Sequence, residues 1–143
     1  MISERTVEAN VLVDLFQRIR PQYPDSFVYL PTQREEFIQG YDALVYNINY
    51  PLIFQFKRAF DRNPLKFSIN YGQNEMLLNL TNYLPDSIYY VFPFFSEFDD
   101  LERITPNFLG HCCFIRVEDL GFLPGDQKTF RVKKNVLDGW WKK

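Results

Sequence analysis

Apolar residues recur at helical spacing in two parts of the chain. Within residues 3–20 they return every three or four positions, Ser3 precedes the run as an N-cap, and Pro21 ends it. Residues 73–83 repeat this spacing, with the apolar positions on one face. We therefore expect an amphipathic helix near the start of the chain and a second one near its middle.

Short apolar and aromatic runs outside these helices are typical of strands. The run at 87–95 is apolar at nearly every position, as expected of a strand buried on both faces. Because the second helix lies between it and the strands that precede that helix, a strand, crossover helix and strand predict parallel pairing with a right-handed connection. Residues 96–105 predict a short acidic helix or a loop. Further strands are predicted at 26–31, 44–48, 66–70 and 111–117.

Two polar residues interrupt the second strand of a predicted hairpin. The runs at 44–48 and 52–60 are joined by a turn signal that ends in Pro51, which favours antiparallel pairing. Gln55 and Lys57 lie inside the second run. Since side chains alternate between the two faces of a strand, Gln55 and Lys57 must share one face.

An acidic residue ahead of the hairpin completes a pattern. The hairpin brings Asp42, which follows Gly40 by two positions, towards the end of the sheet that carries Gln55 and Lys57. Gly40-x-Asp42, twelve residues and Gln55-x-Lys57 resemble the PD-(D/E)XK nuclease superfamily, and more closely its Gln-x-Lys variant in Mrr-like restriction endonucleases. Gln55 stands where the superfamily more commonly has Glu or Asp, which removes one negative charge. The resemblance covers about residues 3–95.

The resemblance implies a fold and an activity. The predicted order of helix, hairpin, helix and strand agrees with the superfamily's α-β-β-α-β core, an α/β fold with a mixed central sheet flanked by helices. We expect residues 1–125 to form this domain and the basic segment 126–143 to belong to it. The implied activity is metal-dependent hydrolysis of DNA phosphodiester bonds by an endonuclease, in restriction or defence against foreign DNA.

The implied chemistry needs a hard cation, Mg²⁺ or Mn²⁺, bound by oxygen atoms. Asp42 offers the best-placed carboxylate, Gln55 an amide oxygen and Phe56 a backbone carbonyl. The resemblance adds Glu8, because the first helix of the superfamily often supplies an acidic residue, although Glu8 also fits an ordinary surface glutamate. Lys57 would orient or deprotonate the attacking water and stabilise charge on the phosphate. In the simplest alternative, Asp42 is a turn residue and Lys57 a lysine that snorkels from a half-exposed strand.

Three further residues are secondary candidates for the metal site or for binding substrate. Glu36 would share the face of Asp42 on a continuous strand but would lie about 20 Å away, unless the chain bends near Gly40. Gln73, at the start of the second helix, is expected to bind the substrate backbone or the amide at position 55. Arg58 is expected to contact substrate.

Composition and charge limit the partners. A net charge of −2 over 143 residues argues against charge-driven coating of nucleic acid. The charge is uneven, because residues 126–143 hold six basic and two acidic residues, a net charge of +4, which leaves −6 for the preceding residues. This basic tail either contacts a phosphate backbone or a partner, or is a solvated end.

The cysteines and the ends of the chain carry less information. His111 lies beside Cys112 and Cys113, but adjacent thiols cannot form the spaced pairs of a zinc site, so core packing is the favoured interpretation. Neither a secretory signal nor an apolar run long enough for a membrane span is visible. We therefore expect a cytoplasmic protein with reduced thiols and no membrane partner.

Three functions remain open at this point. The first is the endonuclease, which at this chain length would need a homodimer or a separate targeting subunit to select its DNA. The second is a catalytically inactive module that keeps the nuclease fold and binds protein or nucleic acid, with Gln55 as the sign of lost metal binding. The third is an assembly module with an aromatic interface. Its candidate residues are Tyr89, Tyr90, Trp140 and Trp141.

Overall fold

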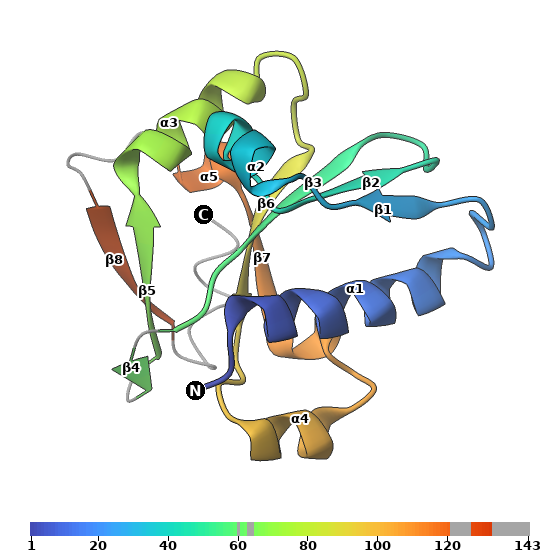
Figure 1. The fold of residues 1–143 in the computed structure, drawn as a ribbon, viewed down its shortest axis with the longest axis vertical. Helices are drawn as coiled ribbons and strands as arrows, with labels where there is room; N and C mark the ends of the chain where they lie inside the picture. Colours follow the sequence, from blue (N-terminus) through green and yellow to red (C-terminus); the bar gives the residue numbers. More distant parts are fainter. Residues whose placement is uncertain (60, 63–64, 121–126, 133–143) are drawn as a thin grey trace.

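A five-stranded mixed sheet separates two layers of helices (Figure 1). The computed structural model describes residues 1–59, 61–62, 65–120 and 127–132. The helices are α1 (Glu4–Ile19), α2 (Gln33–Gln39), α3 (Tyr71–Leu80), α4 (Phe98–Ile104) and α5 (Val117–Leu120), with a 3-10 turn η1 (Leu109–His111). The strands are β1 (Phe27–Tyr29), β2 (Ala43–Tyr46), β3 (Leu52–Phe56), β4 (Asp61–Arg62), β5 (Leu65–Asn70), β6 (Ile88–Pro93), β7 (Cys112–Arg116) and β8 (Gln127–Val132).

The main sheet has the strand order β1-β2-β3-β6-β7. β1, β2 and β3 form an antiparallel meander, β6 runs parallel to β3, and β7 is antiparallel to β6. A smaller antiparallel sheet, β4-β5-β8, lies to one side of the main sheet, next to α3 (Figure 1). The fold class is therefore α/β with a mixed sheet flanked by helices, as the sequence predicts.

Local signals explain the helix that precedes β2. The Thr32 hydroxyl accepts a hydrogen bond from the backbone N–H of Glu35, and the Glu35 carboxylate accepts one from the N–H of Thr32, which forms a capping box. Gly40 ends α2 with φ of 81°, a left-handed conformation that glycine adopts without the steric penalty of a side chain. The helix and this turn fold the chain back towards the start of β2.

Each face of the main sheet has its own apolar core. α1 and α4 cover one face, and α3 and α5 cover the other (Figure 1). The α1-side core includes Val7, Val11, Phe54, Phe56 and Val91. The α3-side core includes Ile53, Phe67, Leu77, Tyr90 and Phe92. Because Phe54 and Phe56 face α1, the alternation along β3 directs Gln55 and Lys57 to the α3 face.

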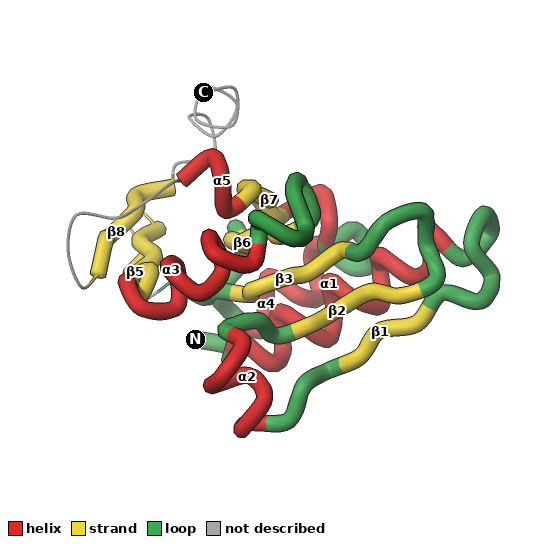
Figure 2. The backbone as a smooth tube through the Cα atoms, turned by 90° about the horizontal axis from the view of Figure 1, so that it is seen from above, coloured by secondary structure: helices red, strands yellow, loops and turns green. Residues whose placement is uncertain are grey.

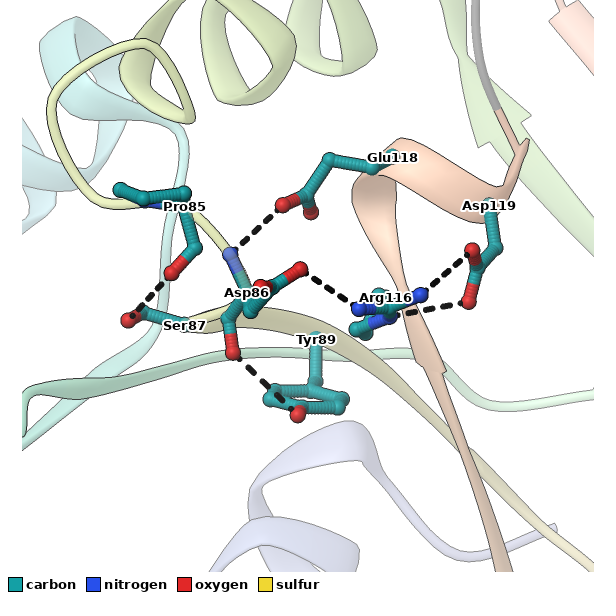
Figure 3. A network of polar contacts seen from close by, with 7 residues as sticks. All are labelled: Pro85, Asp86, Ser87, Tyr89, Arg116, Glu118 and Asp119. Carbon is teal, nitrogen blue, oxygen red and sulfur yellow. Dashed lines mark hydrogen bonds and ion pairs between the residues drawn. The ribbon is translucent and has the colours of Figure 1, made fainter.

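A polar network fixes the connection between α3 and β6 (Figure 3). Arg116 of β7 pairs with Asp86 and, through two N–H groups at 3.0 and 3.1 Å, with the carboxylate of Asp119. The backbone N–H of Asp86 donates to Oε2 of Glu118 at 2.7 Å. These contacts tie the start of β6 to β7 and α5. They lie at the opposite end of the parallel β3–β6 pair from Lys57.

Most of the predicted elements are confirmed, including the first helix, the hairpin and the parallel strand that follows α3. The sequence patterns do not predict α2, β4 or α5. Residues 127–132 of the predicted basic tail form β8, and the rest of that tail, with Trp140 and Trp141, lies outside the described residues. The inclusion of Tyr90 in an exposed aromatic interface is wrong, because its side chain is fully buried. No helix in the described ranges is both long enough and apolar enough to cross a membrane.

Candidate functional site

Asp42 lies where β2 begins beside the end of β3. Its backbone N–H donates to the carbonyl of Phe54 at 2.9 Å, and its Oδ2 accepts a hydrogen bond from the N–H of Phe56 at 2.8 Å. The register of the two strands puts Asp42 opposite Gln55, with both side chains on the α3 face. Figure 2 shows this end of β2 and β3 lying between α2 and α3. The structure therefore brings the two halves of the sequence motif together.

Lys57 extends the same face by one further position. Its Nζ donates to Oε1 of Gln73 at 2.8 Å, and Gln73 is held in turn at the start of α3, where its N–H donates to the Asn70 side chain. Burial lowers the pKa of Lys57, and the negative charges of nearby carboxylates oppose part of that change. Gln73 thus fixes the lysine, whereas the sequence suggested that it contacts substrate or the amide at position 55.

Glu36 reaches Asp42 from α2. The pKa of Asp42 is raised to about 8, mainly by burial and also by a hydrogen bond with the Glu36 carboxyl, and the hydrogen bond from the Phe56 N–H offsets part of this rise. A hydrogen bond between two carboxyl groups requires a proton on one of them. The sequence suggested a separation of about 20 Å on a continuous strand. The helix and the turn at Gly40 remove that separation.

Two acidic residues of α1 approach the same site. The pKa of Glu8 is raised to about 6, mainly by burial and also by the charge of Glu36, with a partial offset from Arg5. Burial also raises the pKa of Glu4, and the charges of Lys57 and Arg58 oppose this rise. Four carboxyl groups therefore act on one another here, those of Glu4, Glu8, Glu36 and Asp42.

The amide of Gln55 is buried, and only one of its two polar atoms has a hydrogen-bond partner among the described residues. The side chain is 3% exposed, and its Nε2 donates to the carbonyl of Phe56 at 3.3 Å. Its Oε1 is buried and has no hydrogen-bond partner among the described residues. An unpartnered buried acceptor costs about 1–3 kcal/mol, so it calls for a reason such as a bound ion.

The Arg58 side chain does not join Lys57 on the α3 face. It is exposed, and its guanidinium lies 3.5 Å from the backbone carbonyl of Ile2, near the start of α1. Its charge acts on Glu4. Arg58 therefore lies with the N-terminal segment, whereas Lys57 faces α3.

A cleft opens beside Glu36 and Gln73, the partners of Asp42 and Lys57. It has a volume of about 790 Å³, and its lining includes Glu36 and Gly40 on one side and Asn70 and Gln73 on the other. Since Glu36 contacts Asp42 and Gln73 contacts Lys57, the cleft adjoins the site.

The donor set suits a single divalent cation of the magnesium type. Among the described residues, no three His, Cys, Asp or Glu side chains are grouped closely enough to hold a metal ion. Mg²⁺, however, commonly takes one or two carboxylates and completes its shell with water and phosphate oxygens. Asp42, the free Oε1 of Gln55 and the carbonyl of Phe56 provide one carboxylate and two neutral oxygens. The unpartnered Oε1 is the observation that fits a bound cation.

The chain was compared with known proteins. No family model, no curated protein and no solved structure matches it. The arrangement of residues therefore carries the functional argument.

The structure adds two acidic residues to the surroundings of Asp42, and it also bears on the zinc interpretation of His111 and its neighbouring cysteines. No sequence pattern assigns Glu4 to the site, and Glu36 is only a secondary candidate from the sequence because a continuous strand, rather than the helix that the capping box begins, is expected there. For the zinc alternative, Nδ1 of His111 lies 2.8 Å from the carbonyl oxygen of Asn107, and Cys113 is buried, which raises the pKa of its thiol to about 12. A thiol protonated to that pH is a poor metal ligand.

Proposed function

We propose that this chain is a metal-dependent nuclease that hydrolyses DNA phosphodiester bonds, with Asp42, Gln55 and Lys57 at its centre. The observation that carries the proposal is the convergence of these three side chains on one face of two paired strands, with the buried Oε1 of Gln55 left without a partner. Folded proteins rarely leave a buried acceptor without a hydrogen-bond partner unless it has another role.

The order of elements supports a restriction-endonuclease-like core. α1 is followed by the β2–β3 hairpin, then α3, and then β6 parallel to β3. This is the helix, hairpin, helix and strand arrangement that the resemblance to PD-(D/E)XK nucleases implies. β1 and α2, which precede Asp42, and β4 and β5, which lie between β3 and α3 in the chain, are additions to it.

The residues of the proposed site would have two roles, binding the metal ion and activating the attacking water. A Mg²⁺ or Mn²⁺ ion held by Asp42, Gln55 and the carbonyl of Phe56 would act as a Lewis acid on the scissile phosphate. Burial lowers the pKa of Lys57, so it releases a proton more readily than an exposed lysine, and Gln73 fixes its Nζ. Lys57 can therefore orient the attacking water and accept its proton.

The cellular setting follows from the resemblance and from the charge. A net charge of −2 gives the chain little non-specific attraction for DNA. A homodimer or a separate targeting subunit is therefore the proposed means of selecting the substrate. Restriction or defence against foreign DNA in the cytoplasm is the proposed role.

Cleavage of two circular DNA substrates tests the proposal. Supercoiled plasmid and single-stranded circular DNA are incubated with Mg²⁺ or Mn²⁺ and with wild type, Asp42→Ala or Lys57→Ala. We expect metal-dependent cleavage that each substitution reduces about 100-fold or more. Glu102→Ala, an exposed acidic position on α4, is the matched control and should cleave normally. Wild type that is folded but cleaves neither DNA with either metal contradicts the proposal.

One observation favours a second candidate, a nuclease-fold module that binds without cleaving. The described residues hold no group of three metal-ligating acidic, histidine or cysteine side chains. In that case neither metal would alter the melting temperature, and DNA binding would be the same in Asp42→Ala and wild type.

A further inference from the structure

An aromatic groove continues from the cleft beside Asp42. It has a volume of about 570 Å³ and lies between α3 and the β2–β3 hairpin. Met76 lines both the groove and the cleft, and a side chain added at Gly40 would come within 3.4 Å of its methyl group. The groove and the cleft therefore adjoin at Met76, close to Gly40.

The groove follows β2, the strand that begins directly after Asp42. Leu44 and Tyr46 line it, and they succeed Asp42 at two-residue steps on the same face of β2. At about 3.4 Å per residue, these positions lie roughly 7 and 14 Å along the strand from Asp42. A strand of nucleic acid with its phosphate at Asp42 would thus carry its next nucleotides over the groove.

The lining of the groove suits flat uncharged rings. None of the described side chains that line it is charged. Tyr83 is 82% exposed and Tyr46 is 42% exposed. The Tyr46 ring is stacked on Phe27 with ring centroids 5.1 Å apart, which makes a two-ring platform across β1 and β2. A phosphate backbone would need lysine or arginine in the lining, whereas nucleobases stack on aromatic side chains.

We propose that this groove binds unpaired nucleobases next to the scissile phosphate, so that the substrate is single-stranded or locally unpaired DNA. The inference rests on the proposed nuclease function and names its substrate class. In a duplex the bases are stacked inside the helix and cannot reach Tyr46 and Tyr83 unless they are flipped out or unpaired.

A binding measurement without cleavage tests the groove separately from catalysis. Fluorescence anisotropy of a labelled 12-nucleotide DNA is recorded as a single strand and as a duplex, with Asp42→Asn as the background so that no DNA is cut. We expect the single strand to bind more tightly, and Tyr83→Ala to weaken it about tenfold. Tyr83→Phe keeps the ring and should bind within about twofold of the background protein. Phe98→Ala, an exposed aromatic position on α4, is the matched control and should bind normally.

The outcomes separate the inference from the nuclease proposal. Equal binding by Tyr83→Ala and its background, or tighter binding of the duplex, overturns the groove as a base-binding site. If the single strand binds through Tyr83 but wild type cleaves neither DNA form, the groove stands and the nuclease proposal fails. If wild type and Tyr83→Ala cleave duplex equally well and leave single strands intact, the nuclease proposal stands and the inference fails.

Discussion

Two acidic side chains of this chain, the buried Asp14 and the half-buried Asp42, lie in opposite electrostatic environments. Asp14 of α1 is 5% exposed and accepts hydrogen bonds from Arg18 at 3.0 and 3.3 Å and from the backbone N–H of Leu109 at 2.8 Å. Asp42 accepts one backbone hydrogen bond and otherwise faces the carboxyl of Glu36. Burial acts to raise the pKa of both groups.

The difference lies in the partners. At Asp14 the hydrogen bonds from Arg18 and from backbone N–H groups outweigh the effect of burial and lower the pKa. At Asp42 the neighbouring carboxyl groups add to the effect of burial and raise it. Asp14 thus stabilises the contact between α1 and η1, whereas Asp42 is destabilising unless a proton or a cation is present. Such a conflict is typical of a functional site.

The largest expected effect is on cleavage. Asp42→Asn should reduce metal-dependent cleavage about 100-fold or more, because an amide is a poorer ligand for a hard cation than a carboxylate. Asp14→Asn, assayed at a temperature where it is folded, should cleave as wild type does. Initial rates on single-stranded circular DNA measure both. A comparable loss in the two variants would remove the distinction between the sites.

The same two variants should differ in the sign of their stability change. Asp14→Asn loses the ion pair with Arg18 and brings amide hydrogens towards the Leu109 N–H, so we expect a loss of about 2–3 kcal/mol in the free energy of unfolding. Urea denaturation followed by circular dichroism measures it. An unchanged unfolding midpoint would show that Asp14 is not a structural anchor.

Asp42→Asn should stabilise the metal-free protein at pH 8 by about 1–2 kcal/mol, because it removes a carboxylate that other carboxyl groups repel and keeps an acceptor for the Phe56 N–H. The pKa of Asp42 is raised in the folded state, so its contribution to stability is fully present below about pH 4 and is lost as pH rises towards about 8. The gain should therefore vanish at low pH. A destabilised variant at pH 8 would mean that Asp42 is satisfied as Asp14 is.

The dependence on pH should run the other way for Asp14. Its pKa is lowered in the folded state, so its stabilising contribution is present above the unfolded value and is lost as pH falls through the folded one. The destabilisation caused by Asp14→Asn should shrink on acidification. Melting temperatures measured from pH 3 to pH 8 follow both variants, and parallel curves would contradict the comparison.

The smallest expected effect is a shift in the pKa of Asp42. Glu36→Gln removes a neighbouring charge, so the pKa of Asp42 should move back towards the ordinary aspartate value. Carbon-13 NMR of the side-chain carboxyl groups during a pH titration measures it. Glu102→Gln, at an exposed position on α4, is the control. An unmoved Asp42 titration would show that burial alone sets its pKa.

The hairpin part of the site could be predicted from the sequence. The alternation along β3 puts Gln55 and Lys57 on one face, and a two-stranded register leaves few positions for Asp42. The mixed sheet and the parallel strand after α3 followed from the same patterns. These features depend on local periodicity, which the sequence carries directly.

The acidic surroundings of Asp42 depend on less local features. Glu36 required the capping box of Thr32 and Glu35 to be recognised together with the stop at Gly40, a signal that the sequence did contain. The approach of Glu4 depends on how α1 crosses the sheet, which no spacing reveals. The contact of Lys57 with Gln73 depends likewise on how α3 packs against β3.

Metal binding tests the central claim most directly. Thermal denaturation of wild type and Asp42→Asn is recorded at pH 8 with and without millimolar Mn²⁺. If Asp42 and Gln55 hold a cation, Mn²⁺ should raise the melting temperature of wild type by about 5 °C and leave that of Asp42→Asn unchanged. No rise in wild type, or an equal rise in both proteins, would contradict a metal site at Asp42.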